Sequence, residues 1–172
     1  MSFSIEPAEI NDAAALDHLV NSAYRGDSSR LGWTTEADLL DGGRVDVASL
    51  EEILRSPGNK ILKYLEGVQI LGCVYLHRDD EKLYLGMLSV QPRDQNKGIG
   101  KKLLAAAEQE AVKLGCISIY MTVISIRKEL INWYVRHGYR LTGEKKPFTI
   151  NDPRFGLPKS KLEFVVLEKK MD

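Results

Sequence analysis

Three apolar runs follow one another closely in the middle of the chain, at Lys60 to Leu65, Gln69 to His77 and Lys82 to Val90. Glu66-Gly67 separates the first run from the second, and Asp79-Asp80-Glu81 separates the second from the third. Apolar runs of this length with turn residues between them predict the strands of an antiparallel meander. The chain is therefore expected to build its fold around a sheet.

The third run is apolar on both of its faces. Alternation along a strand divides its side chains into two sets. One set is Leu83, Leu85 and Met87, and the other is Tyr84, Leu88 and Val90. A strand with two apolar faces is typical of the centre of a sheet that helices cover on both sides.

The other segments predict a mixture of strands and helices. Strands are expected at 3–10, 117–123, 139–143 and 162–167, and helices after the Asn11 or Asp12 cap and at 48–54, 98–114 and 127–137. The segment from 24 to 46 is rich in Gly, Asp, Ser and Thr and is expected to form a long, partly helical loop. The pattern predicts one α+β domain over residues 1–172, with a mixed, mostly antiparallel central sheet and helices on both faces.

Composition excludes several classes of function. Lys and Arg number 24 and Asp and Glu also 24, so the chain lacks the positive field by which nucleic-acid-binding proteins gather phosphates. No segment reaches the ~18 apolar residues of a membrane span, and the first ten residues do not resemble a signal peptide. Cys73 and Cys116 lie within apolar segments and are expected to be reduced core residues. We therefore expect a cytoplasmic protein without a nucleic-acid or membrane partner.

The segment from Val90 to Lys101 carries the strongest functional signal, because it lies between a buried strand and an amphipathic helix. Gly98 and Gly100 would let a ligand approach the backbone closely. The N–H groups and the positive dipole at the start of the helix favour a phosphate. Gln95, Lys97 and Lys101 add donors, although a tight turn without a ligand would explain the glycines equally well.

Two known phosphate-binding patterns do not fit this loop. The Walker loop requires Gly where Gln95 stands and Ser or Thr where Lys102 stands. The dinucleotide fingerprint requires a third Gly at the position of Leu103, and it opens a βαβ unit where this chain has a meander.

The loop instead resembles the acetyl-CoA motif of the GNAT N-acetyltransferase superfamily. Gln95-x-x-Gly98-x-Gly100 follows a strand that ends in Leu88-Ser89-Val90. Further along the chain, Trp133-Tyr134-Val135-Arg136-His137-Gly138-Tyr139 is similar to the Leu-Tyr-x-x-x-Gly-Phe run of that family. The resemblance is sharp over residues 85–140. It implies the GNAT fold and the transfer of an acetyl group from acetyl-CoA, as a cosubstrate, to an amine.

The resemblance also implies where the cosubstrate binds. The strands ending at Val90 and Val123 should run parallel and then separate, which leaves a gap for the pantetheine arm. Arg127 stands where the family often has Asn, seven residues before the tyrosine. The implied acetyl-CoA-binding residues are Leu88, Val90, Gln95, Asn96, Lys97, Gly98, Ile99, Gly100, Lys101 and Arg127.

For the chemistry, the resemblance implies that Tyr134 is the general acid that protonates the leaving thiolate. An amine with a pKa of about 10.4 is neutral in only one of ~2,500 molecules at pH 7, so a base must help to deprotonate it. The strand from Tyr84 to Val90 lacks the acid that the family often has there. The family builds its acceptor site partly from the segment after the first helix, so the resemblance implies a base there, at Glu36, Asp38 or Asp41, with Glu36 as the first candidate. Trp33, Asp38 and Asp41 are the candidate acceptor-binding residues.

Several alternatives stay open on sequence alone. Arg25 and Arg44 could bind an acidic acceptor or pair with the acids near them. The absence of a strand carboxylate also suits a non-catalytic acyl-CoA sensor, and a plain turn at the glycines suits a protein-interaction domain. The three histidines, at positions 18, 77 and 137, have no metal-ligand spacing and are expected to be structural, so no metal is expected. The sequence does not determine whether the acceptor is a small molecule, a peptide or a protein. It also leaves open the acyl length and a homodimer through the last strands.

Overall fold

The structure, a computed structural model, describes residues 2–24, 40–41, 45–147, 157–158 and 162–172. Its helices are α1 (Ala13–Tyr24), α2 (Val47–Arg55), α3 (Ile99–Lys113) and α4 (Lys128–Arg136), with 3-10 turns at Ile10–Asp12 and Pro92–Asp94. The strands are β1 (Ser4–Pro7), β2 (Leu40–Asp41), β3 (Asn59–Glu66), β4 (Gln69–Asp79), β5 (Lys82–Val90), β6 (Ser118–Ile124), β7 (Arg140–Pro147), β8 (Leu157–Pro158) and β9 (Glu163–Lys170). The predicted strands and helices are all present, and the main differences are a first strand that ends earlier, at Pro7, and last strands that run further. Most of the predicted loop at 24–46 lies outside the described residues.

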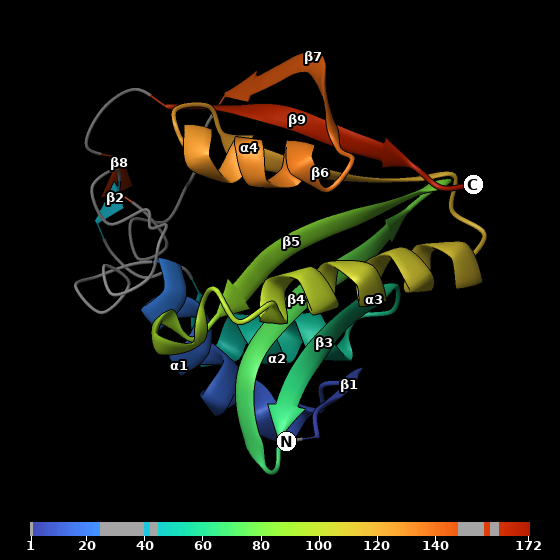
Figure 1. Cartoon of the computed structure of the whole chain (residues 1–172). Coiled ribbons are helices and arrows are strands. Elements are labelled where there is room, and N and C mark those ends of the chain that lie inside the picture. Colours follow the sequence, from blue (N-terminus) through green and yellow to red (C-terminus); the bar gives the residue numbers. More distant parts are fainter. Residues whose placement is uncertain (1, 25–39, 42–44, 148–156, 159–161) are drawn as a thin grey trace.

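Seven of these strands form one sheet in the order β1-β3-β4-β5-β6-β9-β7. The neighbours pair antiparallel except β5 and β6, which run parallel. Helices α1 and α2 cover one face and α3 and α4 the other (Figure 1). This arrangement confirms the predicted α+β class with a mixed, mostly antiparallel sheet, and it confirms β5 as the central strand.

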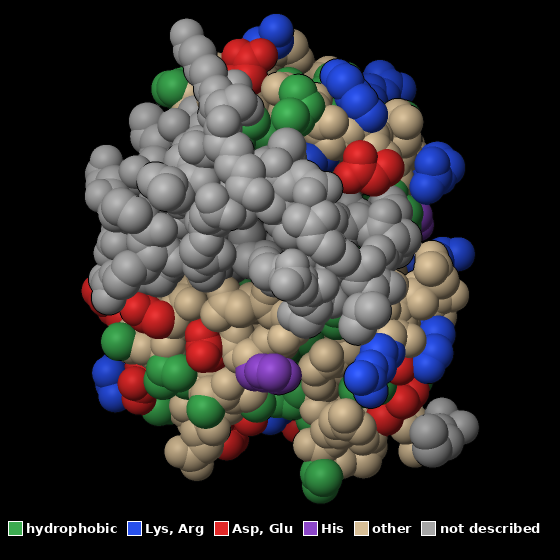
Figure 2. Space-filling view, turned by 90° about the vertical axis from the view of Figure 1, so that its left-hand side faces the viewer, with side chains coloured by type: hydrophobic (Ala, Val, Ile, Leu, Met, Phe, Trp, Pro, Cys, Tyr) green, Lys and Arg blue, Asp and Glu red, His purple; other side chains and the backbone are tan. Residues whose placement is uncertain are grey.

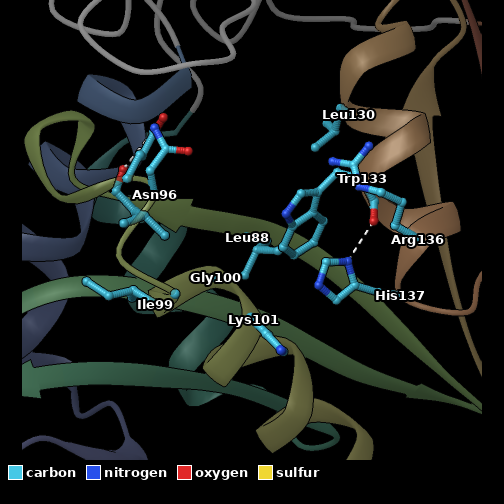
Figure 3. Close-up of a pocket in the computed structure, with 12 residues that line it drawn as sticks. Leu88, Asn96, Ile99, Gly100, Lys101, Leu130, Trp133, Arg136 and His137 are labelled. Carbon is cyan, nitrogen blue, oxygen red and sulfur yellow. Dashed lines mark hydrogen bonds between the residues drawn. The ribbon is translucent and has the colours of Figure 1, made fainter.

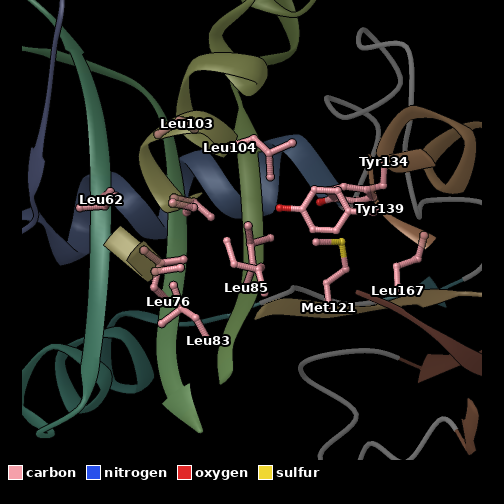
Figure 4. Packing of buried hydrophobic residues seen from close by; sticks show 14 of the residues in the cluster. Leu62, Leu76, Leu83, Leu85, Leu103, Leu104, Met121, Tyr134, Tyr139 and Leu167 are labelled. Atoms are coloured by element: carbon pink, nitrogen blue, oxygen red, sulfur yellow. The ribbon is translucent and has the colours of Figure 1, made fainter. Parts of the chain in front are cut away.

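The core forms one cluster on each face of the sheet. The larger one joins α3 and α4 to the sheet and includes Leu76, Leu85, Leu103 and Tyr139 (Figure 4). The smaller one joins α1 and α2 to the other face, around Leu16 and other buried apolar residues. Both faces of the central strands are therefore covered, as the two apolar faces of the third run predicted.

A β-bulge in β5 changes which side chains face each cluster. Met87 has a left-handed φ of +50°, and Met87 and Leu88 together stand opposite Val74 between the pairs Tyr75↔Gly86 and Cys73↔Ser89. The extra residue reverses the alternation beyond it. The prediction that Met87 shares a face with Leu83 and Leu85 is therefore wrong.

The bulge turns Met87 toward α1 and α2, whereas Leu88 and Val90 turn toward α3 and α4. The hydroxyl of Ser89 donates to the carbonyl oxygen of Met87 at 2.9 Å, which holds the bulge in place. The Cys73 thiol also approaches the same oxygen, with Sγ at 3.8 Å.

Strands β5 and β6 form a fork. They pair at only three positions, from Lys82↔Ser118 to Tyr84↔Tyr120, whereas β6 pairs with β9 along its whole length. Beyond Tyr84 and Tyr120 the two strands separate, which confirms the predicted gap between them. The opening ribbons are visible in Figure 1.

The surface of the described residues carries both signs of charge. On the face in Figure 2, basic and acidic side chains lie beside one another at several places. None of the helices in the described part of the chain is long and apolar enough to span a membrane.

The two cysteines are buried, as predicted, with exposed fractions of 0% for Cys73 and 5% for Cys116. Burial raises the pKa of the Cys73 thiol to about 12, against a smaller opposite effect of its hydrogen bond with Ser89. A thiol reacts as its thiolate, so Cys73 is protected both by inaccessibility and by protonation.

We expect neither cysteine of the native protein to react with a colorimetric disulfide reagent at pH 8. Unfolding in guanidinium should release both thiols to the reagent. Rapid labelling of either cysteine before unfolding would contradict the packing described for the core.

Candidate active site

The loop between β5 and α3 is shaped by two left-handed residues. Asn96 has a φ of +71° and Gly98, which precedes the first residue of α3, has a φ of +82°. Asn tolerates this conformation better than most residues, and Gly adopts it without strain. A Cβ atom at Gly98 would meet no atom within 4 Å, so the backbone conformation, and not crowding, requires glycine there.

The first turn of α3 offers backbone donors to a ligand. The first intrahelical hydrogen bond runs from Lys102 N to Gly98 O at 3.1 Å, so the N–H groups of Ile99, Gly100 and Lys101 lie ahead of the helical ladder. No described side chain caps this helix end. The turn therefore presents uncapped N–H groups and the positive end of the helix dipole, which favours an anion.

These donors open into a cleft of about 400 Å³ between α3 and α4 (Figure 3). The cleft is lined by Leu88, Val90, Gln95, Asn96, Gly98, Ile99, Gly100, Lys101, Leu130, Trp133, Arg136 and His137. The bulge in β5 is the reason that Leu88 and Val90 are on the cleft side of the sheet. The cleft thus combines an apolar floor at the fork with a polar, positively charged end at the helix.

Helix α4 forms the opposite wall of the cleft. The indole of Trp133 reaches across to α3, where a Cβ at Gly100 would lie 3.6 Å from its ring. The His137 imidazole lies against the same indole, with ring centroids 4.2 Å apart, and its Nδ1 is 2.6 Å from the Trp133 carbonyl oxygen. The hydrogen bond is the structural role predicted for His137, but its ring also lines the cleft.

The wall that α4 contributes to the cleft was not predicted from the sequence. Leu130, Trp133, Arg136 and His137 all line the cleft, at spacings of three, six and seven residues that place them on one face of a helix. That spacing was present in the sequence, but it does not show which face of α4 turns toward a cavity.

The basic side chains near the loop divide into two groups. Lys101 and Arg136 line the cleft from its two walls. Lys97 does not, because its Nζ donates to Asp94 Oδ1 at 2.8 Å on the surface, and this hydrogen bond raises the pKa of Lys97. Two cations thus face a space in which backbone donors already favour an anion.

The family of the chain follows from its sequence taken together with this site. A sequence model of the acetyltransferase (GNAT) family matches residues 15–139, which include the whole loop, the fork and α4. The chain belongs to the GNAT family. An acetyltransferase of Agrobacterium fabrum is 29% identical over 107 residues, which cover 62% of this chain and 70% of that protein. Family membership supports acetyl transfer as the general reaction.

Solved GNAT structures share the fold across the full chain. The ribosomal-protein-S18-alanine N-acetyltransferase of Escherichia coli is 12% identical, with a TM-score of 0.73 and coverage of 99% of this chain and 95% of that one. A putative acetyltransferase of Salmonella typhimurium, solved with its cofactor acetyl-CoA, is 20% identical, with a TM-score of 0.72 and coverage of 100% and 95%. An N-acetyltransferase of Thermoplasma acidophilum, solved in complex with coenzyme A, is also 20% identical, with a TM-score of 0.68 and coverage of 99% of both chains. At these identities the likeness concerns the fold alone.

Most residues that the GNAT resemblance implied for the cosubstrate line the cleft. Eight of them do so, and the two that do not are Lys97 and Arg127. The Arg127 side chain is only 5% exposed at the start of α4, with its Nε 3.8 Å from Glu129 Oε1. Val90 is one of the implied binding residues, and its carbonyl oxygen accepts a hydrogen bond from Gln95 Nε2 at 3.2 Å.

Tyr134 directly follows Trp133 on α4 and is 4% exposed. Its ring contacts Trp133 and Tyr139 edge to face, with centroids 5.1 and 5.8 Å away. It lies in the α3-side core (Figure 4) and does not line the 400 Å³ cleft. Tyr134 therefore lies in the core, behind the α4 residues that form the wall of the cleft.

The predicted acceptor residues are mostly beyond what the structure describes. Glu36, Trp33 and Asp38 lie outside the described residues, and so do Arg25 and Arg44. Asp41 is described through its backbone, which pairs with Leu157 in the short β2–β8 ladder. This ladder joins the segment between α1 and α2 to the segment between β7 and β9. Among the described residues there is no group of three or more His, Cys, Asp or Glu that could hold a metal ion.

The two loop glycines predict opposite effects on stability. Gly98→Ala should lower the free energy of unfolding by roughly 1–2 kcal/mol, because alanine is strained at positive φ. Gly100→Ala should not lower it, and a gain of up to about 1 kcal/mol is expected from better helix propensity, because the new Cβ would have only ordinary contacts. Denaturant unfolding of both variants without ligand measures the difference, and equal effects would contradict this geometry.

Proposed function

We propose that this GNAT chain transfers the acetyl group of acetyl-CoA to a primary amine by direct attack in a ternary complex. The observation that carries the proposal is the cleft itself. One end has the uncapped first turn of α3, the other end reaches the fork between β5 and β6, and Lys101 and Arg136 face the cleft from α3 and α4. A ligand with phosphates at one end and a narrow, partly apolar arm matches this distribution of charge.

The residues present fit acetyl-CoA as a substrate. The N–H groups of Ile99, Gly100 and Lys101 would bind its phosphates, with Lys101 and Arg136 adding positive charge. The absence of a side chain at Gly98 and Gly100 leaves the backbone accessible. Leu88, Val90 and Trp133 would contact the pantetheine arm and exclude water from it.

The reaction requires two proton movements. The acceptor amine must lose a proton before its lone pair can attack the thioester carbonyl, and the CoA thiolate must gain one after the carbon–sulfur bond breaks. We assign the second transfer to the Tyr134 hydroxyl, because Tyr134 holds the tyrosine position of the GNAT-like run from Trp133 to Tyr139 and directly follows a residue that lines the cleft. For the first transfer, Glu36 remains our candidate base, with Trp33, Asp38 and Asp41 as candidate contacts for a small-molecule or peptide amine.

A second candidate function is a CoA-binding sensor that lacks turnover. It is favoured by one observation: none of the described residues that line the cleft is a carboxylate. Release of thiol from acetyl-CoA in the presence of amines distinguishes the two functions, since a sensor binds acetyl-CoA but releases no thiol.

The Tyr134→Phe variant tests the enzyme and its acid together. Loss of a general acid typically reduces the rate by 10²-fold or more, so amine-dependent thiol release should fall by roughly that factor. Affinity for CoA, measured by calorimetry, should change little. Tyr139→Phe is the matched control, because Tyr139 is equally buried and its hydroxyl, 3.4 Å from Glu108, lies away from the cleft.

Tyr139→Phe should retain most of the thiol-release rate. Full activity of Tyr134→Phe would remove this tyrosine as the acid and leave the enzyme intact. Absence of thiol release by the native protein with a broad panel of amines, despite binding of acetyl-CoA, would favour the sensor.

A further inference from the structure

Six side chains lie at one register level across six strands of the sheet. Successive pairings connect them as Asn59↔His77, His77↔Tyr84, Tyr84↔Tyr120, Tyr120↔Glu168 and Glu168↔Arg140. Directly paired residues point to the same face of a sheet. These residues, which we name the polar row, therefore form one continuous line on a single face.

The polar row is on the face opposite the CoA cleft. Its neighbours Leu76, Leu83 and Ile119 point the other way and are buried in the cluster under α3. Tyr75 is on the same face as the row and packs against the cluster of α1 and α2, so the row lies on the side of the sheet that these two helices cover. His77, Tyr84 and Tyr120 are only half-buried, so their rings remain accessible beside those helices.

Hydrogen bonds hold most of the rings of this face in place. Asn59 Oδ1 accepts from the Tyr75 hydroxyl at 2.7 Å and lies 2.6 Å from His77 Nδ1. The Tyr120 hydroxyl donates to Asp79 Oδ2 at 2.6 Å. The rings also contact one another, with centroids 6.4 Å apart for Tyr75–His77, 6.1 Å for Tyr75–Tyr84 and 5.4 Å for Tyr84–Tyr120. An ordered set of rings loses little conformational entropy when a ligand binds.

Tyr84 differs from the other rings in two ways. Its hydroxyl has no hydrogen bond to any other described residue. Its ring lies over Gly86, where a Cβ would be only 2.9 Å from Cε2 of the ring. Tyr84↔Tyr120 is the last pair before β5 and β6 separate, and Gly86 lies beyond it, so the contact with Gly86 directs the Tyr84 ring toward the open side of the fork.

We infer that the polar row around Tyr84 and Tyr120 is the acceptor subsite of the proposed acetyltransferase, and that it binds the aromatic ring of an amine substrate. The inference rests on the proposed function, because it needs the thioester at the fork. The amine would reach the thioester through the fork, from the face opposite the cleft, while the ring of the acceptor packs against Tyr84 and Tyr120.

The two acids nearest the rings accept hydrogen bonds from within the protein. Glu168 accepts a hydrogen bond from Lys82 Nζ at 3.1 Å, and Asp79 accepts from Tyr120. The acids beside the rings thus already have partners. The faces of the Tyr84 and Tyr120 rings and the Tyr84 hydroxyl are then the groups that can contact a substrate. They suit an aromatic ring that carries a polar substituent.

The test is calorimetric titration of the CoA-saturated protein with 2-phenylethylamine and with 2-cyclohexylethylamine. The two amines share their charge and chain length and differ in the aromaticity of the ring. An aromatic contact predicts roughly fivefold tighter binding of the phenyl compound, from ~1 kcal/mol for an aromatic pair. Tyr84→Leu should abolish this preference, and Tyr84→Phe should retain it.

Phe3→Leu is the matched control, because Phe3 is an exposed aromatic residue that stacks on Tyr64 beside α3, on the other face. This variant should keep the preference. Equal affinity for the two amines, binding of neither, or a preference that survives Tyr84→Leu would overturn the inference. Failure of CoA itself to bind would refute the proposed function first, so the two failures are distinguishable.

Discussion

The β-bulge at Met87 is the constraint on which the site depends. Without the extra residue, Leu88 and Val90 would point toward α1 and α2, and the cleft under α4 would lose its apolar floor. The bulge requires a left-handed φ at a non-glycine residue, and the hydrogen bond from Ser89 to the Met87 carbonyl stabilises it. A local backbone irregularity of this kind re-aims side chains next to a functional site.

The site depends on the separation of β5 and β6 as well as on the bulge. Parallel strands that stop pairing after three positions leave a gap in the middle of an otherwise continuous sheet. The gap lies between the cleft of α3 and α4 on one face and the polar row on the opposite face. In the reaction that we propose, each substrate would approach from its own side and the reacting atoms would meet in the gap.

Sequence reasoning predicted the parts of this account that depend on local pattern. The meander, the helix after the glycine loop and the central position of β5 followed from periodicity and turn residues. The bulge was missed because simple alternation cannot reveal an inserted residue. The Trp133 and Arg136 wall and the polar row were missed because they depend on how distant segments pair and pack. The acceptor residues around Glu36 remain predictions.

Residue-resolved NMR of the isotope-labelled protein during titration with CoA tests the central claim most directly. We expect the largest amide shifts at Ile99, Gly100 and Lys101, together with a shift of the Trp133 indole N–H, and smaller changes on the far edge of the sheet around β1. Saturable binding with shifts confined to other parts of the sheet, or no binding at millimolar CoA, would contradict the assignment of the cleft.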